Sequence, residues 1–378
     1  MVYADNAATT PLDKRVLEAM LPFLQDNYFN PSSAYRASIR VKSEISRGRA
    51  VIADTIGAKE QEITFTSGGT ESDNLAIKGA AYAYKNKGRH IITTKIEHPA
   101  VLNTCRHLEK EGFEVTYADV NGNGRVEASK IESLICPDTI LVSVMYVNNE
   151  TGVIQPVKEI GAICKKHGVL FHTDAVQAYG HLPIDVNAVN ADMLSVSAHK
   201  IYGPKGTGFL YVRNGVSLEN VLDGGEQESG LRPGTENVAG IMGLAKAAEL
   251  MKAELPKRME KEKSLGNLLY ERISKEIPGI KANTDPEHRV PSILNFSFER
   301  IQGETLLINL DMKGIAASTG SACTQGNGEL SHVLLAMGRS EDEAAASLRL
   351  SLGCMNSEED IRYIADTLSN TIKYLRAI

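Results

Sequence analysis

Two charged residues of this sequence follow short apolar segments, where charge is unusual. Asp174 comes directly after "GVLFHT", and Lys200 comes directly after "MLSVSAH". Both segments have the length and composition of buried strands. Burying an unpaired charge is costly, so each residue needs a partner or a chemical role. A carboxylate at a strand end can also serve only as a helix cap, and Asp174 by itself leaves that choice open.

A glycine-rich turn, residues 67–72 ("SGGTES"), joins another apolar segment to a stretch with helical periodicity. The free N–H groups at the start of a helix and the helix dipole favour a bound phosphate. Such turns are common, so this one indicates phosphate only in combination with other residues. The run "GPKGTG" (203–208) lacks the Walker A spacing and predicts an exposed turn around Lys205.

A phosphate-binding turn, a strand-end aspartate and a strand-end lysine on one sheet are the groups that pyridoxal 5'-phosphate requires. The lysine amine bonds covalently to the cofactor aldehyde, the aspartate pairs with the pyridine nitrogen, and the turn holds the phosphate. A protonated ring is the better electron sink, which is why the aspartate matters. The sequence therefore predicts that Lys200 is the covalent anchor of this cofactor.

The segments that position these residues are predicted strands and helices, which alternate along the chain between residues 60 and 213. Short apolar segments are separated by stretches with helical periodicity. Strands buried on both faces and separated by helices predict an α/β fold with a doubly wound, mostly parallel sheet, whose strand ends bind ligands. A glycine-rich turn between the last two strands predicts an antiparallel edge. The predicted strands are residues 62–66, 90–94, 113–118, 139–147 and 168–175, and the predicted helices are 72–86, 99–111 and 156–167.

The chain is predicted to form two domains. A large cofactor-binding domain is expected over residues 15–255, and a smaller α+β domain over residues 1–14 and 256–378. A charged amphipathic stretch, residues 255–277, is typical of a helix that links domains. Strands are predicted in the small domain at 292–298, 314–319 and 346–352, before a last helix that begins with a capping box of Ser357 and Asp360.

Composition and charge exclude several classes of protein. The 378 residues carry a net charge of −6 with acids and bases interspersed, so no basic face indicates nucleic-acid binding. No apolar run is long enough to span a membrane, and the first ten residues do not form a signal peptide, so a cytoplasmic protein is expected. Five scattered cysteines without a C-x-x-C pair predict neither a disulfide framework nor a metal site.

Taken together, a series of short motifs resembles the cysteine desulfurases of the NifS/IscS branch. These belong to the class-V aminotransferase-like, fold-type-I pyridoxal-phosphate enzymes. The resemblance runs in the same order from residue 3 to about 353. It is carried by "DNAATTPLD", "TSGGTESDNLAI", "EHPAV", "YVNNETG", "HTDAVQA", "SAHKIYGPKGTGFLYVR", "GLRPGTENV" and "TGSACT".

The resemblance implies a role for each residue that matches these motifs. Lys200 would carry the cofactor, Asp174 would hold the ring nitrogen, and His98 would stack on the ring and move protons. Asn149 and Arg349 would receive the substrate carboxylate, since arginine suits a bidentate clamp. The remaining cofactor contacts would be Gly69, Thr70, Ser197 and His199 at the phosphate, Gln177 at the phenolic oxygen, and Thr235 at the phosphate of the partner subunit in a homodimer.

Cys323 lies in "STGSACTQGNG", among small residues without apolar periodicity. A mobile loop at about 318–331 would suit a thiol that enters a site, takes sulfur and delivers it. The sequence departs from the family pattern around it, with Thr319 where serine is common and a changed stretch at 325–328. Gly69 also stands where the family often has alanine, which a phosphate-binding turn tolerates.

The resemblance implies a cysteine desulfurase that converts L-cysteine to L-alanine and transfers the sulfur to Cys323 as a persulfide. The sulfur acceptor would be an iron–sulfur scaffold or a tRNA-thiolation protein. A selenocysteine lyase, or another pyridoxal-phosphate-dependent amino-acid lyase in which Cys323 is incidental, is an alternative. A catalytically inert sulfur-transfer scaffold is a third hypothesis. The residues that count against it are the intact Lys200, Asp174, His98 and Cys323.

Overall fold

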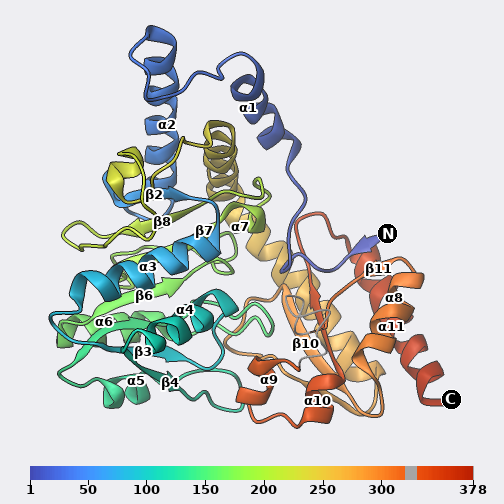
Figure 1. Ribbon diagram of the computed structural model, residues 1–378. Coiled ribbons are helices and arrows are strands. Elements are labelled where there is room, and N and C mark those ends of the chain that lie inside the picture. Colours follow the sequence, from blue (N-terminus) through green and yellow to red (C-terminus); the bar gives the residue numbers. More distant parts are fainter. Residues whose placement is uncertain (320–329, 378) are drawn as a thin grey trace.

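The computed structural model describes residues 1–319 and 330–377. Figure 1 shows a large sheet with helices on both of its faces, beside a smaller α+β unit that contains both ends of the described chain. Cys323 and most of the expected mobile loop lie outside the described residues. Within them, no helix is long and apolar enough to cross a membrane.

The large sheet has seven strands, and its fold class is the predicted one. Its strands run parallel except for β8, which is antiparallel to both of its neighbours, β7 and β2. The predicted antiparallel pairing of the last two strands, β7 and β8, is confirmed, but β8 lies second from the edge because β2 pairs with its other side. In sheet order the strands are β2 (Ile63–Thr66), β8 (Gly208–Val212), β7 (Met193–Ser197), β6 (Leu170–Asp174), β5 (Thr139–Ser143), β3 (His90–Thr94) and β4 (Glu114–Ala118).

Strand β5 is shorter than its apolar sequence predicts. The prediction extended to residue 147, but the strand ends at Ser143. Residues 144–147 stay buried, except for the partly buried Tyr146, and continue alongside β6, where the Val144 and Tyr146 N–H groups donate to carbonyls of His172 and Asp174. Burial on both sides gives this segment the composition of a strand although it has left the regular ladder.

Helices cover both faces of this sheet because successive side chains of a strand point to opposite faces. Ile91 and Leu141 pack against α3 (Gly69–Tyr84) and α4 (Pro99–Lys110). Their neighbours Ile92 and Val142 pack against the opposite layer, which includes α6. The helices of that layer are α1 (Lys14–Gln25), α2 (Arg36–Thr55), α5 (Ala128–Leu134), α6 (Val157–His167) and the first half of α7 (Val238–Glu276).

Helix α7 begins earlier than the predicted linking helix. The charged stretch 255–277 forms its second half, while the helix starts at Val238, after Asn237 accepts a hydrogen bond from the Gly240 N–H at 3.1 Å. The first half packs in the core of the large sheet and the second half in the core of the smaller unit. One continuous helix thus connects the two cores (Figure 1).

The smaller unit forms around a three-stranded antiparallel sheet. The N-terminal segment belongs to it, because β1 (Val2–Tyr3) pairs in parallel with β11 (Ile315–Ala316). The capping box of Ser357 and Asp360 is confirmed by two reciprocal backbone hydrogen bonds. The exact domain boundaries stay a prediction. The sheet order is β12 (Ser347–Ser351), β10 (Ile293–Phe298) and β9 (Ile280–Ala282), with α8 (Gly303–Met312), α9 (His332–Ala336), α10 (Glu341–Ala345) and α11 (Glu358–Ala377) around it.

Candidate active site

A cavity of about 340 Å³ lies at the carboxyl ends of β6 and β7, next to the first turn of α3. This is the edge at which open parallel sheets bind ligands. The predicted residues gather there, with the exception of Thr235 and of Cys323, which is not described. The cavity is lined by Ala7, Ala8, Gly69, Thr70, Asp73, His98, Met145, Val147, Asn149, Asp174, Val176, Gln177, Ser197, His199, Lys200 and Arg349.

The glycine-rich turn brings the backbone of α3 close to the cavity. Gly68 has a φ of +146°, and Gly69 is the first residue of the helix. A Cβ on Gly69 would lie 2.8 Å from Val176 Cγ2, so an alanine there would require the valine side chain to move. The N–H groups of the first helical turn have no partner within the helix and can hold an anion beside Thr70 and Ser197.

Lys200 is held at the cavity by the N-terminal segment. It ends a short 3-10 turn, Ala198–Lys200, that follows β7. Its Nζ donates to the carbonyls of Ala7 at 2.5 Å and Ala8 at 2.7 Å. Gln177 Nε2 donates to the same Ala7 carbonyl at 2.8 Å. The lysine amine is therefore fixed among neutral oxygen acceptors at the cavity wall.

Asp174 is buried at the end of β6, where its Oδ1 accepts a hydrogen bond from the Val176 N–H at 2.9 Å. Burial raises the pKa of this carboxyl to about 6, and the Val176 hydrogen bond and the charge of Lys200 oppose the rise. At neutral pH the group is therefore charged and buried. A cationic partner in the cavity would stabilise it, as a protonated pyridine nitrogen does.

Two histidines at the cavity are neutral at physiological pH. Burial, with the charge of Lys200 next, lowers the pKa of both His98 and His199 to about 4. His98 precedes α4, and its Nδ1 accepts a hydrogen bond from the Ala100 N–H at 3.1 Å, so the proton of the neutral ring sits on Nε2. A neutral imidazole of fixed tautomer can donate from Nε2 and can receive a proton during a reaction.

Arg349 reaches the cavity from β12 of the smaller unit. Its side chain is buried, its Nη2 pairs with Asp5 Oδ1 at 2.8 Å, and its Nη1 donates to the Asn149 carbonyl at 3.0 Å. Its Nε is buried without a hydrogen-bond partner among the described residues. The guanidinium is thus oriented by two contacts and keeps donors for a carboxylate.

These residues fit the predicted pyridoxal phosphate. Gln177 Oε1 is a buried cavity atom that lacks a hydrogen-bond partner within the described part of the chain. Lys200, Asp174 and the glycine-rich turn supply an amine, a carboxylate and an anion-binding backbone around one cavity. The cofactor offers an aldehyde, a ring nitrogen and a phosphate to match them.

Sequence reasoning missed several residues of the cavity. Asp5, Ala7 and Ala8 come from the N-terminal segment, which the motifs included without giving it a role. Asp73 could have been found from helical spacing, because it lies one turn after Gly69 and Thr70 on α3. Thr235 is exposed and does not line the cavity of its own chain.

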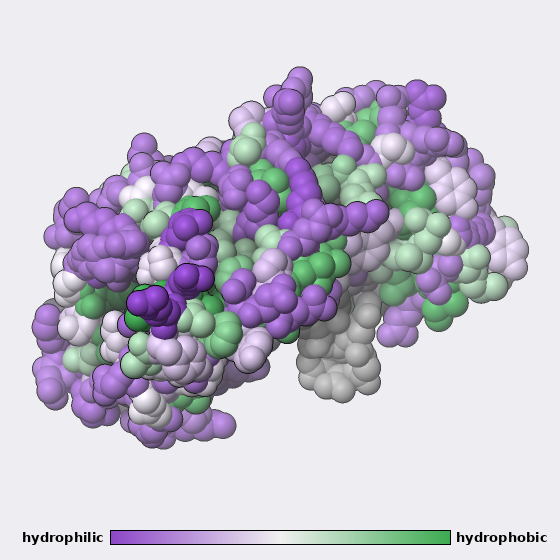
Figure 2. All heavy atoms as spheres, turned by 90° about the horizontal axis from the view of Figure 1, so that it is seen from above, coloured by the Kyte–Doolittle hydropathy of each residue, from purple (hydrophilic) through white to green (hydrophobic). Residues whose placement is uncertain are grey.

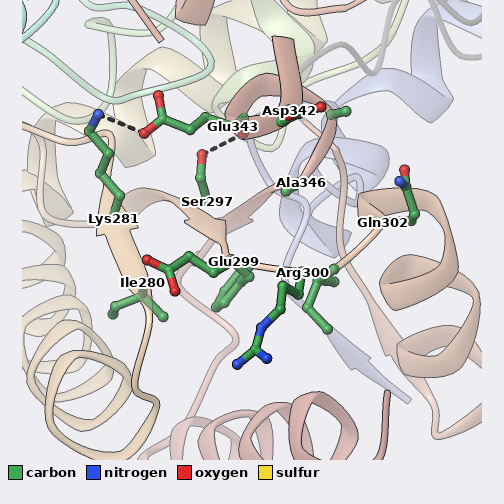
Figure 3. Close-up of a pocket in the computed structure, with 12 residues that line it drawn as sticks. Ile280, Lys281, Ser297, Glu299, Arg300, Gln302, Asp342, Glu343 and Ala346 are labelled. Atoms are coloured by element: carbon green, nitrogen blue, oxygen red, sulfur yellow. Dashed lines mark hydrogen bonds and ion pairs between the residues drawn. The ribbon is translucent and has the colours of Figure 1, made fainter. Parts of the chain in front are cut away.

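A larger groove, of about 890 Å³, lies on the smaller unit and is separate from this site. Figure 3 shows it beside β9, where Lys281 forms an ion pair with Glu343 at 2.8 Å and Ser297 donates to the Glu343 carbonyl at 2.7 Å. It contains none of the predicted residues. The smaller cavity is therefore the candidate active site, because chemistry depends on the groups that meet there and not on volume.

Comparison with known proteins gives one consistent family. The class-V aminotransferase profile matches residues 2–364. The chain is 52% identical to the cysteine desulfurase IscS of Clostridium botulinum (strain Hall) over 377 residues, which span 99% of this chain and 95% of that protein.

Solved structures agree with this match. A protein described as NifS-like has a TM-score of 0.93 and 39% identity, and the match covers 99% of both chains. A structure of SspA in complex with cysteine has a TM-score of 0.84 and 40% identity, covering 93% of this chain and 99% of that one.

Borohydride reduction of the cofactor-loaded protein should attach the cofactor irreversibly to Lys200, because this amine lies at the cavity beside Asp174. Peptide mapping by mass spectrometry would locate the label. Lys205, five residues later and exposed, is the internal control. A label on Lys205, or no labelled lysine, would contradict the assignment of the anchor.

Proposed function

This chain belongs to the class-V aminotransferase family, and we propose that it is a cysteine desulfurase that acts on L-cysteine in the cavity around Lys200. The enzyme depends on pyridoxal phosphate and converts L-cysteine to L-alanine while its sulfur is transferred to a cysteine of the enzyme. The observation that carries the proposal is the meeting of Lys200, buried Asp174 and the clamp residue Arg349 in one cavity.

Pyridoxal phosphate, when bound, supplies an electron sink for the negative charge that develops at the α carbon of the substrate. Asp174 would hold the ring nitrogen, because its buried carboxylate needs a cation. Gln177 would hold the phenolic oxygen. The start of α3 would hold the phosphate, with Gly69, Thr70, Ser197 and His199 around it.

Arg349 binds the substrate carboxylate, together with Asn149, and so orients the substrate over the cavity. Asp5 holds the guanidinium in place from the other side. Lys200 Nζ takes the proton from the α carbon. His98, neutral and with its proton on Nε2, exchanges protons with the reacting groups.

Cys323 completes the reaction in this proposal. Its thiolate attacks the sulfur of the substrate, and the carbon–sulfur bond breaks with its electron pair left on the β carbon. That carbon takes up a proton and L-alanine leaves, while the sulfur remains on Cys323 as a persulfide. Two of the described cysteines are less suited. Cys105 and Cys164 are buried, and burial raises the pKa of each thiol to about 12, which keeps the thiols protonated.

We further propose a homodimer. Exposed large apolar side chains concentrate on α1, α2 and the segment between them, a composition that favours a protein interface. Figure 2, which views the molecule from the side of these helices, shows hydrophobic residues between hydrophilic ones on this face. Exposed Thr235 is then available to the phosphate site of the partner subunit. The apolar residues are Leu17, Leu21, Leu24, Tyr28, Tyr35 and Ile39.

The acceptor of the sulfur is proposed to be a protein, an iron–sulfur scaffold or a tRNA-thiolation protein, because a persulfide is a carrier and not a final product. The cytoplasm is the proposed location. A persulfide and free thiols persist in a reducing compartment, and the four described cysteines are all free.

Replacing Cys323 by serine should block sulfur transfer and leave substrate binding intact, because a hydroxyl is a much poorer nucleophile toward sulfur. L-cysteine should still change the visible absorbance of the cofactor, but alanine formation should fall by roughly 100-fold, which corresponds to about 2.7 kcal/mol of barrier. The exposed Cys136, changed to serine, is the matched control and should keep wild-type turnover.

Mass spectrometry should find no persulfide in the Cys323→Ser protein. A normal alanine yield from that variant would remove Cys323 from the mechanism and favour a simple pyridoxal-phosphate lyase. Comparing L-cysteine with selenocysteine as substrate tests the selenocysteine lyase alternative, which needs no thiol nucleophile.

Replacing Tyr28 by aspartate should separate the subunits and weaken cofactor binding, since the phosphate would lose Thr235 of the partner subunit. Sedimentation should give twice the 41.0 kDa chain mass for the wild type and the mass of one chain for the variant. Met312→Asp, a substitution at another exposed apolar residue far from α1 and α2, is the control and should remain dimeric. A monomeric wild type with full cofactor affinity would contradict the homodimer.

A further inference from the structure

A second carboxyl group, that of Asp73, lies on the wall of the cavity and has no part in the mechanism above. It comes from the first turns of α3, shares the cavity with Asp174, and is only 1% exposed. Its Oδ1 is buried without a hydrogen-bond partner among the described residues. Buried polar atoms normally have partners, so this oxygen requires an explanation.

The groups around Asp73 form a polar layer beneath the cavity. His172, two residues before Asp174 on β6, points to the same face of the sheet, and its Nε2 lies 3.6 Å from Asp73 Oδ1. Its ring is hydrogen bonded by Ser143 Oγ at 2.8 Å and by Ser195 Oγ at 3.0 Å. Hydroxyls on β5 and β7 thus fix the imidazole from both sides.

None of these neighbours supplies a positive charge to Asp73. Burial lowers the pKa of His172 to about 3, so the ring is neutral. The other titratable groups that face Asp73 are acids, Asp174 from β6 and Glu97 from the segment after β3. Two cations line the cavity, and each has other partners. Lys200 acts on Asp174 and donates to backbone carbonyls, and Arg349 pairs with Asp5.

Two carboxyl groups that share a buried site repel each other when both are charged, and one of them keeps its proton. Asp174 accepts a backbone N–H hydrogen bond and lies nearer the charge of Lys200, so it is the one that ionises. Burial and then the charge of Asp174 raise the pKa of Asp73 well above its usual value, although a hydrogen bond with the Ser195 side chain opposes the rise. Glu97, whose pKa burial raises to about 8, adds to this effect.

We infer that Asp73 is a positioning residue that acts as a neutral carboxylic acid beneath the cavity, donates its proton within the polar layer, and leaves the negative charge to Asp174. The inference rests on the proposed cofactor site. A neutral Asp73 matches the single charge of Asp174 to the single charge of a protonated ring nitrogen. An ionised Asp73 would place two negative charges against that nitrogen.

The Asp73→Asn variant tests this inference, because asparagine keeps the shape and a hydrogen-bond donor without a charge. Apoprotein should bind pyridoxal phosphate within about threefold of the wild-type dissociation constant. Binding should weaken at acid pH as Asp174 takes up a proton near its pKa of about 6. The pH at which binding weakens should be the same in Asp73→Asn as in the wild type. Leucine is similar in volume but has no hydrogen-bond donor, so Asp73→Leu should bind pyridoxal phosphate about tenfold more weakly than Asp73→Asn.

An ionised Asp73 would give a different pH dependence of cofactor binding. If Asp73 were ionised, its charge would raise the pKa of Asp174. Removing that charge would then lower the pH at which cofactor binding weakens by about one unit. Such a move in Asp73→Asn would overturn the inference, whereas a wild-type protein that binds no pyridoxal phosphate would contradict the proposed function itself.

Infrared spectroscopy of the wild type gives a readout that does not depend on a variant folding. Protein labelled with carbon-13 only in its aspartate carboxyl groups should show the carbonyl stretch of a protonated carboxylic acid at neutral pH. The label excludes Glu97, and folded Asp73→Asn should lack the band. A wild-type spectrum with only ionised aspartates would overturn the inference.

Discussion

The carboxyl group of Asp174 is buried at the end of β6, and its need for a cation determines what the cavity can bind. The position follows from the fold, because parallel strands bring their carboxyl ends to one edge of the sheet. The helix that begins at Gly69 and the lysine that follows β7 meet at the same edge. A ligand that places a protonated ring nitrogen at Asp174 can therefore place its phosphate and its aldehyde at groups suited to them.

The site also depends on contacts between the two sheets. The N-terminal segment leaves the smaller unit after β1, pairs Asp5 with Arg349, and then presents the carbonyls of Ala7 and Ala8 to Lys200. Arg349 in turn comes from β12 of the smaller sheet. Arg349 and Lys200 are thus connected through one short backbone segment, so the two side chains are positioned together.

The parts of this site that sequence reasoning predicted are those with a local signal. Asp174 and Lys200 are charges at the ends of apolar segments, and Gly69 lies in a glycine-rich turn before a helix. The resemblance to the desulfurases supplied His98, Gln177 and Arg349, which have no local signal of their own. Ala7 and Ala8 act through backbone carbonyls, which side-chain chemistry cannot indicate. The place of β8 inside the sheet depends on its pairing with β2, about 140 residues earlier in the chain, and no turn signal reports such a contact.

The central claim is that Asp174 binds the ring nitrogen of pyridoxal phosphate, and an analogue with carbon in place of that nitrogen tests it most directly. The affinities of the apoprotein for pyridoxal phosphate and for 1-deazapyridoxal phosphate would be measured by calorimetry, with wild type and with Asp174→Ala. The wild type should prefer the nitrogen-containing cofactor by roughly 100-fold or more, about 2.7 kcal/mol, and the variant should lose this preference. Equal affinities of the wild type for both compounds would contradict the account.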